Sequence, residues 1–278
     1  MTPPPDSSSG TSVAATPVED ILETFRRDGI AVARFSDLLG DELWQDAVTD
    51  ITPFVASTEA EAARLGARER GEGKDEVIVR RFYEKGREAH RYALSDAWLR
   101  IAASETVLDI VNGYAGAPAR LTYVDNWYTV PYPLATERVA SQRWHRDPED
   151  DHIVKMFVYF SEVDEGAGPF EYVRQSAAGA KYGELFAWRD GHRYPSTDEL
   201  EAAVDPADRL TLTGPAGTVI FCDTGGFHRG GFARTSPRIL MISTFLRESA
   251  RKGKRRYAVD FEGREDTLSA QARHALAG

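Results

Sequence analysis

From about residue 119 onward the chain consists of short runs rich in β-branched and aromatic residues, and this pattern constrains its fold most strongly. The runs are LTYVDNWYTV, HIVKMFVYF, PFEYV, LTLTG, GTVIFCD and RILMISTFL. Clusters of Gly, Pro and Asp separate them, as expected where turns join strands. No regular strand–helix alternation of the kind that builds a parallel sheet accompanies them. Residues 119–246 therefore predict a sandwich or barrel of short strands.

The segments that flank these runs differ in character. Residues 1–17 are dominated by Pro, Ser, Thr and Gly, and they offer too little apolar surface to offset ordering entropy, so we expect a disordered leader. Residues 18–118 carry apolar residues at helical spacing around one short strand, IAVARF. They predict the helical part of a single domain over residues 18–246. The tail at 247–278 is charged, and we expect it to be partly helical.

Four segments give sharper predictions. The run DLLGDELWQDAVTDI predicts one helix, and the highly charged residues 57–75 predict a solvated helix or a loop. Residues 90–116 predict two short helices that are divided near Ser104. Residues 181–208 interrupt the strands, and we expect this insertion to lie over one mouth of the β-structure. Ser196 with a glutamate three residues later predicts a helix with a capping box inside the insertion.

Charge and composition exclude several classes of function. The 278 residues carry 34 Lys and Arg against 44 Asp and Glu, a formal net charge of −10, which argues against nucleic-acid binding. One cysteine, Cys222, excludes an intramolecular disulfide and a multi-cysteine metal site. No apolar run is long enough to span a membrane, and no secretory signal precedes the first helix. We expect a cytoplasmic protein that acts on a small molecule, with neither a nucleic-acid nor a membrane partner.

Three residues form a candidate metal site. His145 and Asp147 are two positions apart, so in an extended segment both side chains point to one face. His228 follows 83 residues later, after the run GTVIFCD and a Thr-Gly-Gly turn. Two histidines and one carboxylate on one face of an ion leave open positions opposite, which suits non-haem Fe(II) oxygen chemistry. The triplet alone is also explained by a surface salt bridge, and Asp150 or His152 is an alternative ligand.

Three further polar residues lie within otherwise apolar runs. Arg238 shares a strand face with Leu240 and Ile242, so it points inward if that face is core. A buried guanidinium needs a partner, either a carboxylate of the protein or an acidic cosubstrate beside the metal. Lys155 poses the same question within HIVKMFVYF, and Asn126 is the third such residue.

These residues and their surroundings resemble the phytanoyl-CoA dioxygenase family of Fe(II)/2-oxoglutarate oxygenases. The resemblance covers residues 18–246 and is carried by EDILETFRRDGIAVARF, by WHRDPEDDHIVKMFVYFSEVDEGAGPFEYV and by FCDTGGFHRGGFARTSPRILMISTFL. It implies a double-stranded β-helix, a jelly-roll and cupin-like core with helices on its outer face. It also implies that His145, Asp147 and His228 bind Fe(II) and that Arg238 holds the distal carboxylate of 2-oxoglutarate. Lys155 and Asn126 are secondary candidates for cosubstrate binding.

The resemblance further implies a reaction. 2-Oxoglutarate and O2 would be converted to succinate and CO2 while a carbon of the substrate is oxidised. In related halogenases the position of Asp147 is Ala or Gly, so a carboxylate there favours hydroxylation or desaturation. The chain departs from the family at VRQSA, where Pro-Gly-Ser-His is common, in a loop that shapes the substrate pocket.

Two alternatives to a 2-oxoglutarate oxygenase stay open at this point. One is a cupin-like metal enzyme that does not use 2-oxoglutarate, and the other is a β-sandwich binding protein without catalysis. The basic run RKGKRR is either a contact for the phosphates of an acyl-CoA or a solvated part of the tail. We expect a substrate from bacterial secondary metabolism or one that resembles an amino acid.

Overall fold

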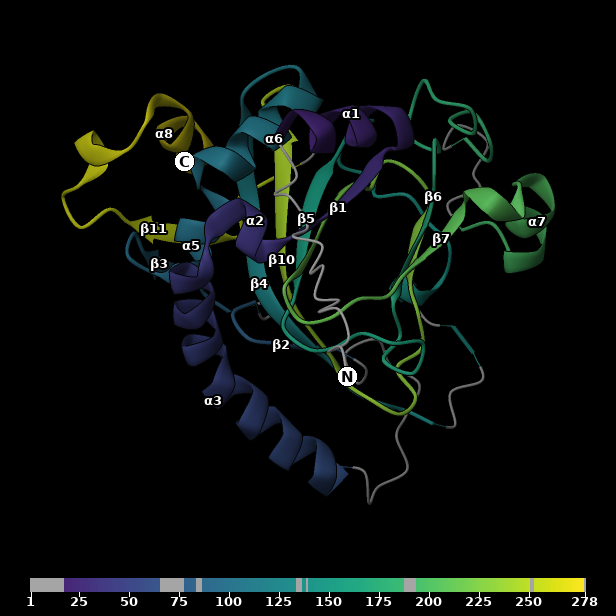
Figure 1. Cartoon of the computed structure of the whole chain (residues 1–278), viewed down its shortest axis with the longest axis horizontal. Coiled ribbons are helices and arrows are strands. Elements are labelled where there is room, and N and C mark those ends of the chain that lie inside the picture. The colour runs from purple at the N-terminus through teal and green to yellow at the C-terminus, as the bar shows by residue number, and fades with distance from the viewer. Residues whose placement is uncertain are drawn as a thin grey trace, which may run out of the picture.

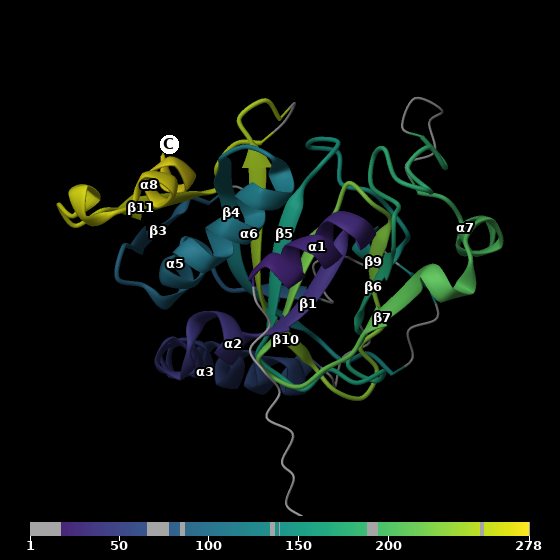
Figure 2. The same cartoon turned by 45° about the horizontal axis from the view of Figure 1, so that its top comes forward.

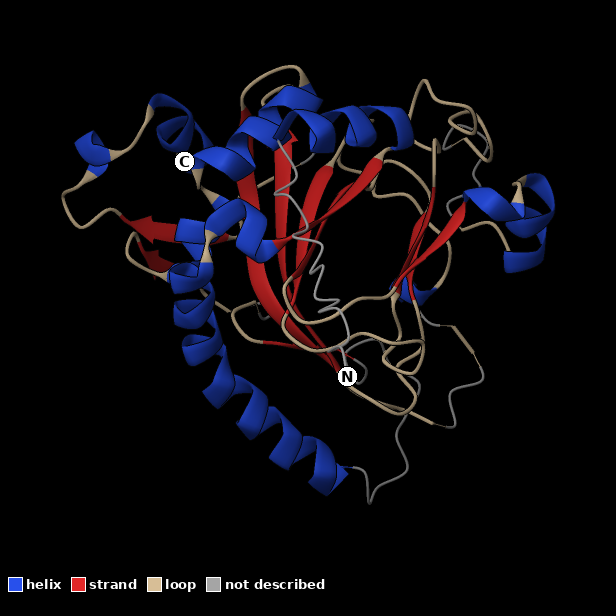
Figure 3. Ribbon diagram, in the orientation of Figure 1, coloured by secondary structure: helices blue, strands red, loops and turns tan. Residues whose placement is uncertain are grey.

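Two antiparallel sheets that face each other form the centre of the molecule (Figures 1 and 3). A computed structural model describes residues 18–65, 78–83, 87–133, 137–138, 140–187, 194–250 and 253–277, so the predicted leader lies outside the described residues. In spatial order, the six-stranded sheet consists of β1 (Ile30–Arg34), β8 (Thr218–Asp223), β5 (Val154–Tyr159), β10 (Arg238–Arg247), β4 (Ala119–Thr129) and β2 (Ile78–Arg80). The three-stranded sheet consists of β7 (Arg209–Leu212), β6 (Phe170–Val173) and β9 (His228–Gly230).

Alternate residues of the six-stranded sheet pack into two different cores. On the face toward the three-stranded sheet, here the inner face, Phe157, Ile220 and Leu240 pack against Phe170 and Tyr172 of β6. On the opposite face, here the covered face, the intervening residues of the same strands join a larger cluster with the helices. This arrangement follows from the two-residue period of strands. The predicted mainly β fold with a jelly-roll core and flanking helices is confirmed.

The helices lie mostly on the covered face, as Figure 2 shows. They are α1 (Val18–Asp28), α2 (Phe35–Leu39), α3 (Asp41–Leu65), α5 (Ala97–Ala102), α6 (Glu105–Ala115) and α8 (Ala270–Leu276), with α7 (Thr197–Ala203) on the other side of the molecule. Short 3-10 turns occur at Ala140–Gln142, Pro206–Asp208 and Glu265–Thr267. Ser104 caps α6, so the predicted division of residues 90–116 near this serine is confirmed. None of the described helices could cross a membrane.

The prediction of one helix over DLLGDELWQDAVTDI is wrong. The structure has two helices, α2 and α3, and Gly40 separates them with φ of 76°. This left-handed backbone is easy for glycine and costly for other residues, so the helix ends there. The charged segment predicted at 57–75 continues α3 as far as Leu65, and the rest of it lies outside the described residues.

One strand occurs where a helix was predicted, and its partner lies in the tail, which was predicted to be only partly helical. His90–Ala93 forms β3, which pairs in parallel with β11 (Tyr257–Asp260) from the C-terminal tail. Each strand is only four residues long, so neither shows an alternation that sequence analysis can detect. The predicted helix in the tail is present as α8, whose Ala275 and Leu276 join the core of the covered face.

The insertion at 181–208 lies largely on the outer side of the three-stranded sheet. Its helix α7 has the predicted capping box between Ser196 and Glu199. Leu200 of α7 packs with Trp144, Val173 and Phe227, which form a third apolar cluster. The described residues of the insertion therefore pack on this outer side.

Candidate metal centre

The structure brings His145, Asp147 and His228 together on the inner side of the barrel. One ligand atom from each residue lies within 4.8 Å of the other two. The Nε2 atom of His145 is 3.9 Å from Asp147 Oδ1, and Nε2 of His228 is 3.7 Å from Asp147 Oδ2. Among the described residues this is the one group of three or more His, Cys, Asp or Glu side chains that could hold a metal ion.

Backbone pairing places the three ligands. His145 and His228 form a two-way antiparallel bridge, with N–H···O distances of 3.1 and 3.0 Å. The amide of Asp147 then donates to the carbonyl of Thr224 at 2.9 Å. Because strand β9 is also paired with β6, His228 is fixed between two neighbouring segments. Ligands that are far apart in sequence thus belong to one hydrogen-bonded ladder.

Hydrogen bonds at the far side of each ring orient both imidazoles. Nδ1 of His145 lies 2.8 Å from the carbonyl of Arg143, and Nδ1 of His228 lies 3.0 Å from that of Gly226. A backbone carbonyl accepts a hydrogen bond from Nδ1–H, so the unprotonated nitrogen of each neutral ring is Nε2. Burial, with the nearby His145, lowers the pKa of His228 to about 3. A neutral imidazole with Nε2 turned inward is the form that binds a metal ion.

Lys155 lies beside the Asp147 carboxylate. Its Nζ is 2.5 Å from Asp147 Oδ2, and both side chains are less than a fifth exposed. Burial alone would raise the pKa of Asp147, but the positive charge of Lys155 together with the two histidines holds it well below the usual range. Burial likewise opposes the charge on Lys155, and Asp147 restores it, so that its pKa is raised. The anion that this lysine requires is therefore the carboxylate of the candidate metal site.

A second buried carboxylate, Asp223, connects the segments that carry the ligands, and sequence analysis missed it. Its Oδ1 accepts hydrogen bonds from the amides of Ile153 and Gly225, both at 2.9 Å. Its Oδ2 lies 2.7 Å from both the Tyr114 hydroxyl and His152 Nδ1. These bonds join α6, the segment after Asp147 and the turn before His228. The signal in the sequence is an acid that ends an otherwise apolar strand, FCD.

Arg238 is buried on the inner face without an acidic partner. Its side chain is 5% exposed, and its Nη1 donates to the carbonyl of Gly168. Its Nε has no hydrogen-bond partner, and no carboxylate pairs with it among the described residues. Nη2 lies 3.3 Å from the point that a Cβ of Gly230 would occupy, so the guanidinium lies beside strand β9. Gly230 follows His228 by two residues on that strand, and both positions face inward.

Asn126 lies on the opposite side of the sheet. It is paired directly with Met241, which belongs to the core of the covered face. Residues that are directly opposite in an antiparallel pair share a face. The side-chain amide of Asn126 is therefore not brought to the metal ligands, and the role predicted for it in cosubstrate binding finds no support in this placement. Neither its Oδ1 nor its Nδ2 has a hydrogen-bond partner among the described residues.

The alternative ligands are engaged elsewhere. Asp150 pairs with Arg247 at 2.8 Å, and His152 pairs with Asp223. The hydrogen bond to Asp223 raises the pKa of His152. His90 packs in an aromatic group with Phe82 on the covered side. Tyr194 of the insertion lies close to the site, with its ring centroid 6.0 Å from that of His145.

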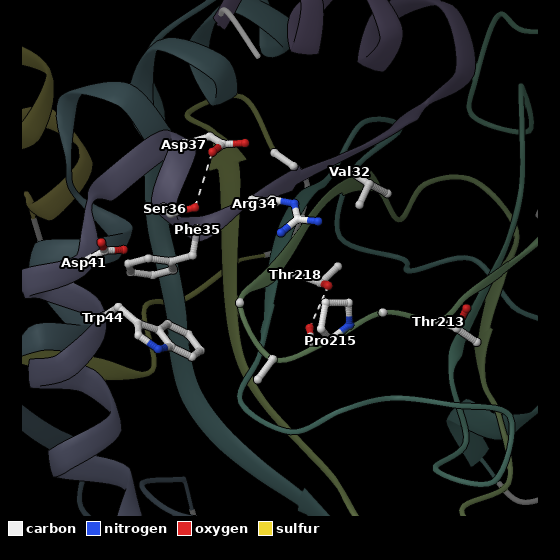
Figure 4. A pocket seen from close by; sticks show the side chains of 14 residues that line it. Val32, Arg34, Phe35, Ser36, Asp37, Asp41, Trp44, Thr213, Pro215 and Thr218 are labelled. Carbon is white, nitrogen blue, oxygen red and sulfur yellow. Dashed lines mark hydrogen bonds between the residues drawn. The ribbon is translucent and has the colours of Figure 1, made fainter. Parts of the chain in front are cut away.

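A cavity of about 410 Å³ lies elsewhere, between α2, the start of α3 and the loop before β8 (Figure 4). Its lining includes Arg34, Trp44 and Pro215 and none of the three candidate ligands. Cavity size thus does not identify the site, and the chemistry of the side chains does.

The comparisons with known proteins support the fold. No family model matches the chain, and no curated protein matches it in sequence. The solved structure of AviO1 from Streptomyces viridochromogenes Tue57 is 16% identical with a TM-score of 0.54 and covers 85% of this chain and 98% of its own. EctD from S. alaskensis, solved with 2-oxoglutarate and 5-hydroxyectoine, is 17% identical with a TM-score of 0.53 and covers 92% of each chain. The chain is thus similar to these proteins in fold.

Proposed function

We propose that the chain is a non-haem Fe(II)/2-oxoglutarate-dependent dioxygenase that hydroxylates or desaturates a small molecule. One observation carries the proposal. A largely buried two-histidine, one-carboxylate cluster shares the interior of a jelly roll with Arg238, a buried arginine that pairs with no acid among the described residues. A metal site alone occurs in many classes of enzyme, and a buried arginine alone occurs in many protein cores without a catalytic role. Their combination suits a metal that works together with an acidic cosubstrate.

The donor set fits Fe(II). His145 and His228 present Nε2, and Asp147 presents carboxylate oxygens, which are the ligands of facial-triad iron enzymes. A closed structural zinc site would need a fourth protein ligand, and the cluster has three among the described residues. When bound, iron and 2-oxoglutarate would supply the oxidising equivalents, with 2-oxoglutarate and O2 giving succinate and CO2 as the substrate is oxidised.

The residues of the chain would bind 2-oxoglutarate, orient the metal ligands and exclude water from the site. Arg238 would hold the distal carboxylate of 2-oxoglutarate through two parallel hydrogen bonds, and its Nε is a buried donor without a partner among the described residues. Lys155 would remain beside Asp147 and balance its charge. Phe157, Leu240 and Phe170 line the same interior, so water is largely excluded from the space between the sheets.

The fold is compatible with this chemistry in a similar protein. The solved EctD structure holds 2-oxoglutarate and 5-hydroxyectoine, a hydroxylated small molecule. For the present chain we propose a substrate of similar scale, in bacterial secondary metabolism. The single cysteine, Cys222, suits the reducing cytoplasm in which we expect the enzyme to work.

Conversion of 2-oxoglutarate to succinate tests the proposal. The wild-type chain with Fe(II) and air should form succinate slowly even without substrate, at a rate that depends on O2. His145→Ala should abolish this conversion and retain less than a tenth of the bound iron, because two ligands hold Fe(II) poorly. Arg34→Ala, on the exposed side of β1, is the matched control and should behave as wild type. Stoichiometric iron and unchanged succinate formation in His145→Ala would contradict the assignment.

A further inference from the structure

Two arginines share one tyrosine ring near the free edge of the six-stranded sheet. The guanidinium carbon of Arg80 is 5.7 Å from the ring centroid of Tyr83, and that of Arg256 is 5.4 Å from the same centroid. Arg80 also lies 5.2 Å from the ring of Trp127, and Arg256 lies 5.8 Å from that of Tyr123. We call these five residues the arginine–aromatic cluster. It draws together β2, the segment after it, β4 and the segment before β11.

The arginine–aromatic cluster lies on the inner face of the six-stranded sheet, the face that carries Lys155. Tyr123 is paired across β10 with Thr244, and Thr244 is paired with Lys155, the residue that contacts Asp147. Neighbouring strands are about 4.8 Å apart, so Tyr123 and Lys155 are separated by about 10 Å along one row of the inner face. Arg238 pairs with Thr129 at the other end of β4. Arg80 pairs with Trp127, and Trp127 pairs with Leu240, two residues from Arg238. The cluster therefore lies on the same inner face as Lys155 and Arg238.

Neither arginine of the cluster forms an ion pair with a residue that the structure describes. Among the described residues, no carboxylate lies within ion-pair distance of Arg80 or Arg256, and the buried Nε of Arg80 has no hydrogen-bond partner. Arg81, the residue after Arg80, does form an ion pair, with Asp50 at 2.7 Å. Arg80 is partly buried, and a buried charge needs a partner, which the described residues do not supply. Arg256 is exposed, so water meets its charge.

Asp125, the acid that contacts both tyrosines of the cluster, is already fully engaged. Its Oδ1 accepts from the amides of Phe82 and Asn126, each at 2.8 Å. Its Oδ2 accepts from the amide of Tyr83 at 3.2 Å and the hydroxyl of Tyr123 at 2.9 Å. A carboxylate has about four acceptor positions, so none is left for an arginine. Asp125 instead fixes the two tyrosines against which the guanidinium groups pack.

We propose that the arginine–aromatic cluster binds an anionic group of the substrate, a carboxylate or a phosphate. This inference rests on the proposed oxygenase function, since it places the substrate beside the metal ligands. A guanidinium that packs its plane on an aromatic ring keeps its N–H edges free for an oxyanion. The rings of Tyr83 and Trp127 would accept a flat or apolar portion next to that anion. The substrate class is therefore a small organic acid or phosphate ester, whose anion would lie at the end of the inner face that carries the cluster.

Binding of simple probes tests the inference without turnover. The full-length chain would be titrated anaerobically with phenylacetate, phenyl phosphate and the neutral phenylacetamide, using Trp fluorescence and calorimetry. Saturating Fe(II) and 2-oxoglutarate would first occupy the site at Arg238. Arg80→Gln and Arg256→Gln are the test variants. Arg34→Gln, which removes the same charge from an exposed position on β1, is the matched control, and melting curves would confirm that all variants fold.

We expect at least one of the two anions to bind and the neutral amide to bind at least tenfold more weakly. Arg80→Gln should weaken the anion at least tenfold, because a charge-assisted hydrogen bond is lost, whereas Arg34→Gln should change nothing. The preferred anion identifies the substrate as an acid or a phosphate ester. Equal affinity in wild type and Arg80→Gln, or an equal loss in Arg34→Gln, would overturn the inference.

Repeating the titration without metal or 2-oxoglutarate separates this inference from the proposed function. Binding of an anion that depends on Arg80, in a chain that binds neither Fe(II) nor 2-oxoglutarate, would support the anion site and contradict the oxygenase. A chain that binds Fe(II) and 2-oxoglutarate but shows no anion binding dependent on Arg80 would overturn the site alone.

Discussion

The two faces of the six-stranded sheet are built from the same strands but carry different residues. On the covered face, Met156, Phe221 and Met241 are buried among helices in an apolar core. On the inner face, the alternate positions of the same strands include Lys155 and Arg238, both with little contact with water. The covered face therefore holds the larger apolar core, and the inner face holds buried charged groups, among them the Lys155–Asp147 pair.

This division separates stability from chemistry along single strands. In β10, Ile239 and Met241 pack under the helices, whereas Arg238 and Leu240 face the second sheet. A substitution on one face can therefore change stability without changing metal or cosubstrate binding, or the reverse. Such substitutions test the difference between the two faces.

The largest effect is expected on the covered face. Phe221→Ala removes a fully buried ring from β8 and should lower the free energy of unfolding by about 3–5 kcal/mol, measured by urea denaturation. The metal affinity of the folded fraction should not change, because Phe221 points away from the ligands. A selective loss of metal binding in the folded protein would break the separation between the two faces.

Asp223 is expected to affect both stability and metal binding. Asp223→Ala leaves the Tyr114 hydroxyl and two backbone amides without their acceptor, so we expect a loss of about 2–4 kcal/mol in stability. It should also weaken Fe(II) binding, because the turn before His228 loses its anchor. Calorimetry with Fe(II) measures the second effect, with Asp205→Ala on the surface as control. Wild-type iron affinity in Asp223→Ala would show that the backbone ladder alone positions the ligands.

Arg238 should affect cosubstrate binding and little else. Arg238→Gln should raise the KM for 2-oxoglutarate by about 10- to 100-fold, since two charge-assisted hydrogen bonds are lost. The melting temperature should stay within about 3 °C of wild type, because no internal ion pair is broken. An unchanged KM would transfer the role to another cation, first of all Lys155.

The smallest effect is expected at Asn126. Asn126→Leu replaces an amide without partners by an apolar side chain among apolar neighbours, so stability should rise or change by less than about 1 kcal/mol. The affinity for 2-oxoglutarate should not change. Weaker 2-oxoglutarate binding with unaltered stability would restore Asn126 as a cosubstrate contact and contradict its assignment to the covered face.

Sequence analysis predicted the parts of the site that follow from strand alternation. The spacing of His145 and Asp147 and the shared face of Arg238, Leu240 and Ile242 depend only on the two-residue period, and the structure has both arrangements. Asn126 was harder to place because its strand is buried on both faces along most of its length. Such a strand has no polar alternation to show which face is inner.

Contacts between segments that are distant in the sequence could not be predicted from it. The arginine–aromatic cluster joins residues from three parts of the chain, and Arg256 belongs to a basic run for which a solvated tail was one interpretation. The pairing of His90–Ala93 with Tyr257–Asp260 is equally nonlocal. The stability of a strand depends on its partner as much as on its own residues. The sequence of a short segment therefore does not show that it forms a strand.

The most direct test of the central claim is an anaerobic absorbance titration of the metal-free protein with Fe(II) and 2-oxoglutarate. We expect a weak visible charge-transfer band that appears only when both are present and that is reduced in His228→Ala and Asp147→Ala. Iron binding without the band would indicate a metal enzyme that does not use 2-oxoglutarate. The absence of both iron binding and the band would contradict the account and leave a jelly roll with a coincidental cluster of ligands.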